Sequence, residues 1–100
     1  MRYVMHVTSR ANPGRDEDYD RWYDEIHRVE MLELPGVLSC DRFRELDMEG
    51  KETGIFVAQY GVETDDPAAL LQSIFAAAAT MRLTDAIDAT SARFSFFRPS

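Results

Sequence analysis

The sequence has one cysteine, Cys40, and one lysine, Lys51, among its 100 residues. A single cysteine excludes an internal disulfide and a cysteine-based zinc cage, and it fits a reducing compartment. Because Cys40 lies on an expected strand with ordinary neighbours, we interpret it as a small core residue rather than a nucleophile. Chemistry at a thiol is therefore not expected.

Long apolar runs and phosphate-binding loops are also missing. No apolar stretch approaches the ~20 residues of a transmembrane helix, so no membrane partner is expected. Residues 1–10 lack the apolar segment and cleavage site of an export signal, from which we expect a cytoplasmic location. The sequence has no glycine-rich phosphate loop, no G-x-S-x-G elbow and no Cys/His metal array. Neither a cofactor nor a metal is expected.

Basic residues are few. Eleven Lys and Arg stand against 18 Asp and Glu, which gives a formal net charge of -7 and argues against nucleic acid as a partner. The content of 45% hydrophobic and 29% charged residues is that of an ordinary folded globule. We expect residues 1–100 to form a single domain, which at this length leaves a large surface for oligomerisation.

An aromatic helix is predicted from Tyr19 onward, ending at Pro35-Gly36. At about 100° per residue, Tyr19, Trp22 and Tyr23 fall on one apolar arc, so this side of the helix is expected to face a core. His27 lies at the rim of the arc. There it could exchange protons with a ligand in a cavity, or it could be a packed or capping side chain.

Glu30 falls inside the same apolar arc, three residues after His27. A buried carboxylate needs a partner, and Glu30 could hold the imidazole in one tautomer and stabilise its protonated form. Met31 and Leu32, however, point away from the arc. This offset predicts that the helix breaks near Arg28 and restarts, in which case the pairing with His27 fails.

Four strands and a second helix are predicted around this segment. Residues 3–8 form a first strand, in which His6 is either a second pocket candidate or a hydrogen-bonded structural histidine. Residues 37–46 and 54–63 form a hairpin with a polar tip. Residues 65–78 form a helix that Asp65-Asp66-Pro67 opens, residues 81–90 continue as a looser helical segment, and residues 92–97 form the last strand.

The third strand is apolar on both faces. Phe56 and Tyr60 share one side with Ala58 and Val62, while Val57 lies on the other. The chain's own helices can cover only one face, so the other is expected to meet a second subunit in a homodimer. The element order predicts an α+β fold, the ferredoxin-like β-α-β-β-α-β arrangement of an antiparallel four-stranded sheet with two helices on one face.

These residues resemble the EthD-like family of the dimeric α+β barrel superfamily. The resemblance rests on Tyr19, Trp22-Tyr23 and His27, on the junction Leu34-Pro35-Gly36-Val37 and on Arg42-Phe43. It implies that two subunits press their sheets together into a barrel, with a pocket between sheet and helices in each. It also implies that His27 is the histidine that such enzymes are thought to use. Members differ in chemistry, so the resemblance transfers the fold better than the function.

Two classes of function stay open. The first is a cofactor-free enzyme, of lyase, cyclase, isomerase or oxygenase type, that acts by general acid/base catalysis on a small hydrophobic or aromatic intermediate, polyketide-like or catabolic. The second is a non-catalytic dimeric protein that binds a small molecule. We assign catalysis to His27 and Tyr23. The candidates for substrate binding are His6, Trp22, Glu30 and Tyr60.

Overall fold

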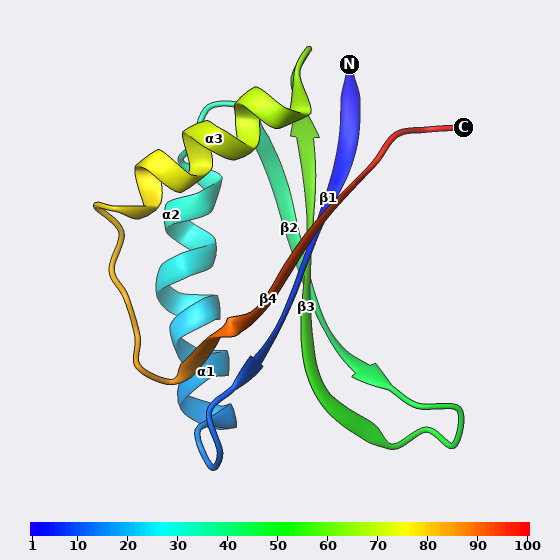
Figure 1. The fold of residues 1–100 in the computed structure, drawn as a ribbon, viewed down its shortest axis with the longest axis vertical. Helices are drawn as coiled ribbons and strands as arrows, with labels where there is room; N and C mark the ends of the chain where they lie inside the picture. Colours follow the sequence, from blue (N-terminus) through cyan, green and yellow to red (C-terminus); the bar gives the residue numbers. More distant parts are fainter.

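The computed structural model describes residues 1–100, and its elements follow the predicted order (Figure 1). In chain order they are β1 (Arg2–Ala11), α1 (Asp16–Trp22), η1 (Tyr23–His27), α2 (Arg28–Leu32), β2 (Val37–Leu46), β3 (Glu52–Glu63), α3 (Pro67–Ala78) and β4 (Ile87–Phe97). Because α1, η1 and α2 follow one another without a break, they form one continuous helix. The predicted β-α-β-β-α-β order is therefore confirmed.

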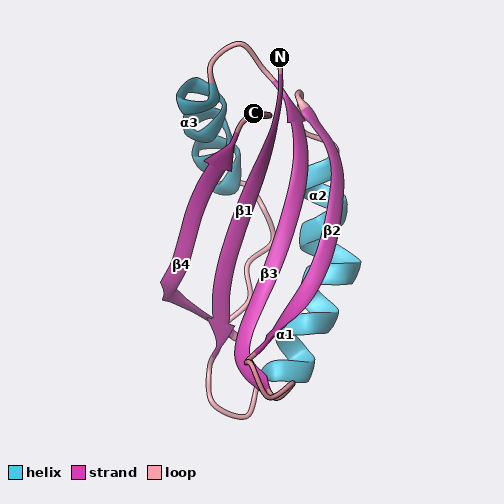
Figure 2. Cartoon of the chain, turned by 90° about the vertical axis from the view of Figure 1, so that its right-hand side faces the viewer, coloured by secondary structure: helices cyan, strands magenta, loops and turns pink.

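The four strands form a single antiparallel sheet in the order β2-β3-β1-β4. The helix of residues 16–32 and α3 both lie on one side of it, and Figure 2 shows the opposite face free of any other element. This is the ferredoxin-like arrangement that the sequence predicts. No helix is long and apolar enough to cross a bilayer.

The core lies between the sheet and the helices. On β3, the side chains of Phe56, Ala58, Tyr60 and Val62 are buried against the helices, as the alternation predicts. Met5 extends this layer onto β1. The outer face of the sheet is covered less well: Val57 is half-buried and its cross-strand neighbour Phe43 is 53% exposed. Both faces of the central strands are thus apolar.

The predicted break in the first helix is wrong, but the irregularity behind that prediction is present. Residues 23–27 form a turn of π-helix, in which the Arg28 N–H donates to the Tyr23 carbonyl five residues earlier. This turn holds one residue more than an α-helical turn. Met31 therefore takes the direction that a regular helix would give Glu30, and its side chain is buried.

The predicted helical segment over residues 81–90 is also wrong. Residues 79–86 form an irregular connection, and β4 begins at Ile87, five residues before the predicted start at Ala92. In the early part of β4, Ile87 pairs with Ala11 of β1 and Asp88 pairs with Arg10. Pairing with a strand distant in sequence decides the conformation here, and local helix propensity cannot foresee that pairing.

Gly36 closes the turn between α2 and β2 in a conformation that disfavours other residues. Its φ is +87°, and a Cβ there would lie 2.9 Å from the Glu63 carbonyl oxygen. We expect Gly36→Ala to lower the free energy of unfolding by roughly 2–3 kcal/mol, because left-handed strain and a backbone clash add. Gly50→Ala is the matched control, since Gly50 has a φ of +81° with nothing within 4 Å. Equal losses in urea denaturation would contradict the clash.

Candidate functional site

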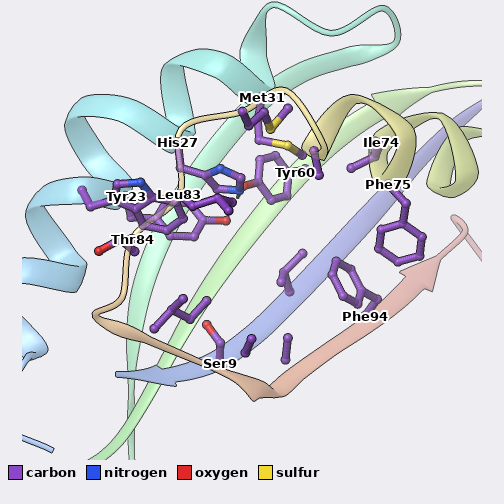
Figure 3. A pocket seen from close by; sticks show the side chains of 17 residues that line it. Ser9, Tyr23, His27, Met31, Tyr60, Ile74, Phe75, Leu83, Thr84 and Phe94 are labelled. Atoms are coloured by element: carbon purple, nitrogen blue, oxygen red, sulfur yellow. Dashed lines mark hydrogen bonds between the residues drawn. The ribbon is translucent and has the colours of Figure 1, made fainter. Parts of the chain in front are cut away.

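A cavity of about 240 Å³ lies between the sheet and the two helices (Figure 3). It is lined by 17 residues, 14 of them hydrophobic, and none carries an Asp, Glu, Lys or Arg side chain. The lining comes from every helix and strand except β2: from β1, the helix of residues 16–32, β3, α3 and β4, and from the connection 79–86. The cavity is thus a product of the complete fold.

Polar groups gather at one end of the cavity. Figure 3 shows His27, Tyr23 and Tyr60 close together there, with Phe75 and Phe94 at the other end. The hydroxyl groups of Tyr23 and Tyr60 are hydrogen-bonded to each other. The apolar end is closed by the rings of Phe75 and Phe94, which meet edge to face with centroids 5.3 Å apart. The cavity therefore has one polar and one apolar end.

The π-turn determines where His27 points. In an α-helix, residues five apart diverge by about 140° around the axis, so Trp22 and His27 would not meet. The wider π-turn places the two side chains on the same side of the helix. Their rings stack with centroids 4.7 Å apart and an interplanar angle of 15°. The edge-on ring of Tyr23, with its centroid 4.9 Å away, contacts the imidazole from a second side.

The imidazole of His27 is held without a hydrogen bond to Nδ1, which is buried and has no partner. Burial lowers the pKa of His27 below its ordinary value; the charge of Glu30 opposes this shift and that of Arg42 adds to it. His27 is therefore neutral at physiological pH. A neutral imidazole in the wall of the cavity can exchange a proton with a ligand that enters.

The two tyrosines beside it are kept protonated. Burial raises the pKa of both Tyr23 and Tyr60 far above the usual phenol value. Since the two hydroxyl groups share one hydrogen bond, one O–H remains to donate elsewhere. Cys40, next to Tyr60, is buried as predicted, and burial raises the pKa of its thiol. The pair can thus offer a hydrogen bond to an oxygen, but it does not supply a base.

Arg42 packs against the polar end of the cavity from outside it, a role not predicted from the sequence. Its guanidinium carbon lies 4.4 Å from the centroid of the Tyr23 ring, and its side chain is only 10% exposed. Nη1 donates to Asp20 at 2.7 Å and to Asp24 at 2.9 Å. The sequence pattern could have indicated this contact. Arg42 lies two residues after Cys40 and therefore on the same, buried side of β2, where an arginine needs partners.

The structure brings together four of the six predicted site residues. Trp22, Tyr23, His27 and Tyr60 all line the cavity. His6 lies on the opposite face of the sheet, where its Nε2 is 3.0 Å from Gln59 Oε1. Alternation along β1 explains this position, because Val7 and not His6 points toward the helices.

Glu30 does not pair with His27. Its two carboxylate oxygens accept hydrogen bonds from the backbone N–H of Arg82 at 3.2 and 3.3 Å. The extra residue of the π-turn is the cause, since it rotates Glu30 off the apolar arc. Glu30 therefore lies outside the cavity lining.

The half of the cavity that α3, residues 79–86 and β4 contribute was not predicted from the sequence. These residues are mostly apolar and carry no chemical motif, so only the pattern of the second helix could have indicated Ile74 and Phe75. The residues missed are Met81, Leu83, Thr84, Ile87, Ala89, Ala92 and Phe94. No three His, Cys, Asp or Glu side chains come together in a way that could hold a metal ion.

The fold is that of a ferredoxin-like α+β domain, and solved structures share it. An EthD family protein from Bacillus halodurans C-125 superimposes with a TM-score of 0.64 at 13% sequence identity, over 98% of this chain and 99% of that chain. The resemblance to EthD-like proteins is thereby confirmed at the level of the fold. No profile of a known protein family matches the sequence, and no curated protein is significantly similar to it.

Burial of His27 has a measurable consequence for titration. We expect its NMR titration midpoint below the ordinary value of about 6.5, because burial disfavours the imidazolium. Between that midpoint and pH ~6.5 the unfolded chain binds a proton that the folded chain does not. Stability should therefore fall as the pH is lowered through this window, and His27→Gln should remove that component.

The only other imidazole is that of His6, and His6→Gln assigns the two sets of resonances. A midpoint for His27 at or above 6.5 would show that the ring is hydrated or paired in solution.

Proposed function

We propose that this protein is a cofactor-independent enzyme that acts by general acid/base catalysis on a small, uncharged hydrophobic or aromatic molecule. The observation that carries the proposal is a buried imidazole, with no hydrogen-bond partner at Nδ1, beside two hydrogen-bonded tyrosine hydroxyls at one end of an apolar cavity. His27 is the proton acceptor and donor, and the pair formed by Tyr23 and Tyr60 orients the polar group of the ligand.

The size of the cavity limits the ligand. An apolar protein cavity of about 150 Å³ holds benzene, so a volume of about 240 Å³ suits a substituted single ring or a small bicycle. The lining offers no charged side chain to pair with a carboxylate or phosphate, and burying such a group unpaired is costly. A neutral ring compound with one polar substituent fits best.

The polar end suits a reaction in which charge develops on an oxygen. A tyrosine O–H can donate to a carbonyl or enol oxygen of the ligand while His27 removes or returns a proton on a neighbouring atom. Isomerisation, cyclisation and elimination next to a carbonyl all need this pair of functions. The EthD family protein shares the fold at 13% identity, and a shared fold does not name a substrate.

Substitution of His27 tests the proposal. His27→Gln keeps polarity and hydrogen bonding but cannot exchange a proton near neutral pH, so we expect turnover to fall by roughly 10²–10⁴-fold with the fold intact. Turnover is measured on a substrate selected from a panel of uncharged aromatic ketones, phenols and lactones, and circular dichroism reports the fold.

His6→Gln is the matched control, because it makes the same change on the opposite face of the sheet. A folded His27→Gln protein within threefold of wild type would remove His27 from catalysis. That result would favour a non-catalytic binding protein, a reading that the predominantly apolar lining also supports.

The outer face of the sheet supports a homodimer. No element of the chain covers it, and it presents Val4, Phe43, Ile55, Val57 and Phe97. In a face-to-face pair of sheets these side chains would be removed from water, as in the barrel that the resemblance implies. We propose that two copies associate through this face.

We expect light scattering at micromolar concentration to give the mass of a dimer. Val57→Asp places a charge at the centre of the proposed interface and should weaken association by roughly 10²-fold or more. Val29→Asp, on the exposed side of α2, is the matched control. A folded wild-type monomer at this concentration would refute the proposed dimer.

A further inference from the structure

Residues 79–86 form one wall of the cavity and are anchored at both ends. At the first end, the Met81 N–H donates to the Ala78 carbonyl at 3.2 Å in the turn that follows α3. At the second end, Asn12 holds the backbone: its N–H donates to the Ala86 carbonyl at 2.7 Å and its side-chain amide donates to the Asp85 carbonyl at 2.8 Å. The ends of the segment are therefore fixed to the body of the domain.

The middle of this segment is held by two side chains that bind the same residue. The N–H of Arg82 donates to the Glu30 carboxylate, and the carbonyl of Arg82 accepts from Trp22 Nε1 at 3.0 Å. Leu83, which follows, lines the cavity with part of its side chain although it is 83% exposed. Met81 packs against the core, but packing does little to hold the exposed residues Arg82 and Leu83 in place.

The same contacts reach the proposed acid/base group. Trp22, which donates to the Arg82 carbonyl, is stacked on the His27 ring. Displacement of the segment would break the indole hydrogen bond and remove a constraint on the ring that covers the imidazole. The position of residues 81–84 and the environment of His27 are therefore linked through one side chain.

From these contacts we infer that residues 81–84 are a lid of the cavity, and that Glu30 and Trp22 form the latch that keeps it closed. Opening breaks the hydrogen bonds on both sides of Arg82 while the anchors at Ala78 and Asn12 stay in place. Closing restores them and seats Trp22 against His27. The use of the lid, admission of a ligand, rests on the function proposed above; the latch itself is a property of the free protein.

Hydrogen exchange in the protein without ligand tests the latch. Trp22→Phe removes the hydrogen bond to the Arg82 carbonyl and leaves the acceptor of the Arg82 N–H untouched. If the two bonds act together, the Arg82 amide should exchange roughly tenfold faster in this variant, because opening is easier. If they are independent static contacts, its rate should stay within twofold of wild type, and the latch is refuted.

Glu30→Ala provides the second arm. It should speed exchange at the Trp22 indole N–H, which donates to the Arg82 carbonyl and not to Glu30, by a similar factor. Glu25→Ala is the matched control, since Glu25 lies exposed on the same helix. Faster exchange confined to Arg82 would show the loss of one local bond and no lid.

Carbethoxylation of histidine gives an independent readout. At about pH 7.5 the lowered pKa of His27 keeps the imidazole neutral in wild type and in Glu30→Ala, so the rate reports access of the reagent. We expect His27 to react several-fold faster in Glu30→Ala, with His6 unchanged as the internal reference. Equal rates at His27 would refute the lid. An active His27→Gln enzyme would overturn the proposed function and leave these exchange rates as they are.

Discussion

The site depends on one turn of π-helix. The five residues from Tyr23 to His27 form a wider turn than an α-helix allows. The side chains that follow in the helix therefore point in the directions that a regular helix would give to the residues one position earlier. Trp22 stacks on His27 as a result, Met31 enters the core and Glu30 leaves it. A regular helix would bury a carboxylate in an apolar layer. The π-turn replaces it there with a methionine, which removes that cost.

Low polarity around the imidazole gives the site its chemistry. Burial lowers the pKa of His27 and raises those of Tyr23 and Tyr60, so a potential base and two donors stay neutral side by side. The charges that support them lie outside. Arg42 is held by Asp20 and packs against the outer surface of the Tyr23 ring, so it fixes the ring without entering the cavity.

The two faces of the sheet differ in what covers them. The inner face carries Tyr60 and Val7 and forms the floor of the cavity. The outer face carries His6 and Val57 and remains uncovered by the chain itself. Since neighbouring residues of a strand point to opposite faces, a change at the proposed interface can be separated by a single position from a change in the cavity. The fold thus allows the outer face and the cavity to vary independently.

The local pattern of apolar and polar residues alone determined much of the secondary structure and part of the candidate site. Alternation along residues 54–63 and 37–46 gave the hairpin and its buried side, and the aromatic spacing identified Trp22, Tyr23 and His27, because periodicity reports which side of an element is buried. Tertiary structure decided the rest. Pairing with β1 made residues 87–91 a strand, packing selected the π-turn, and the roles of Glu30 and Arg42 depend on partners 52 and 22 residues away. Contacts between residues so far apart in the sequence produce no local sequence pattern from which they could be predicted.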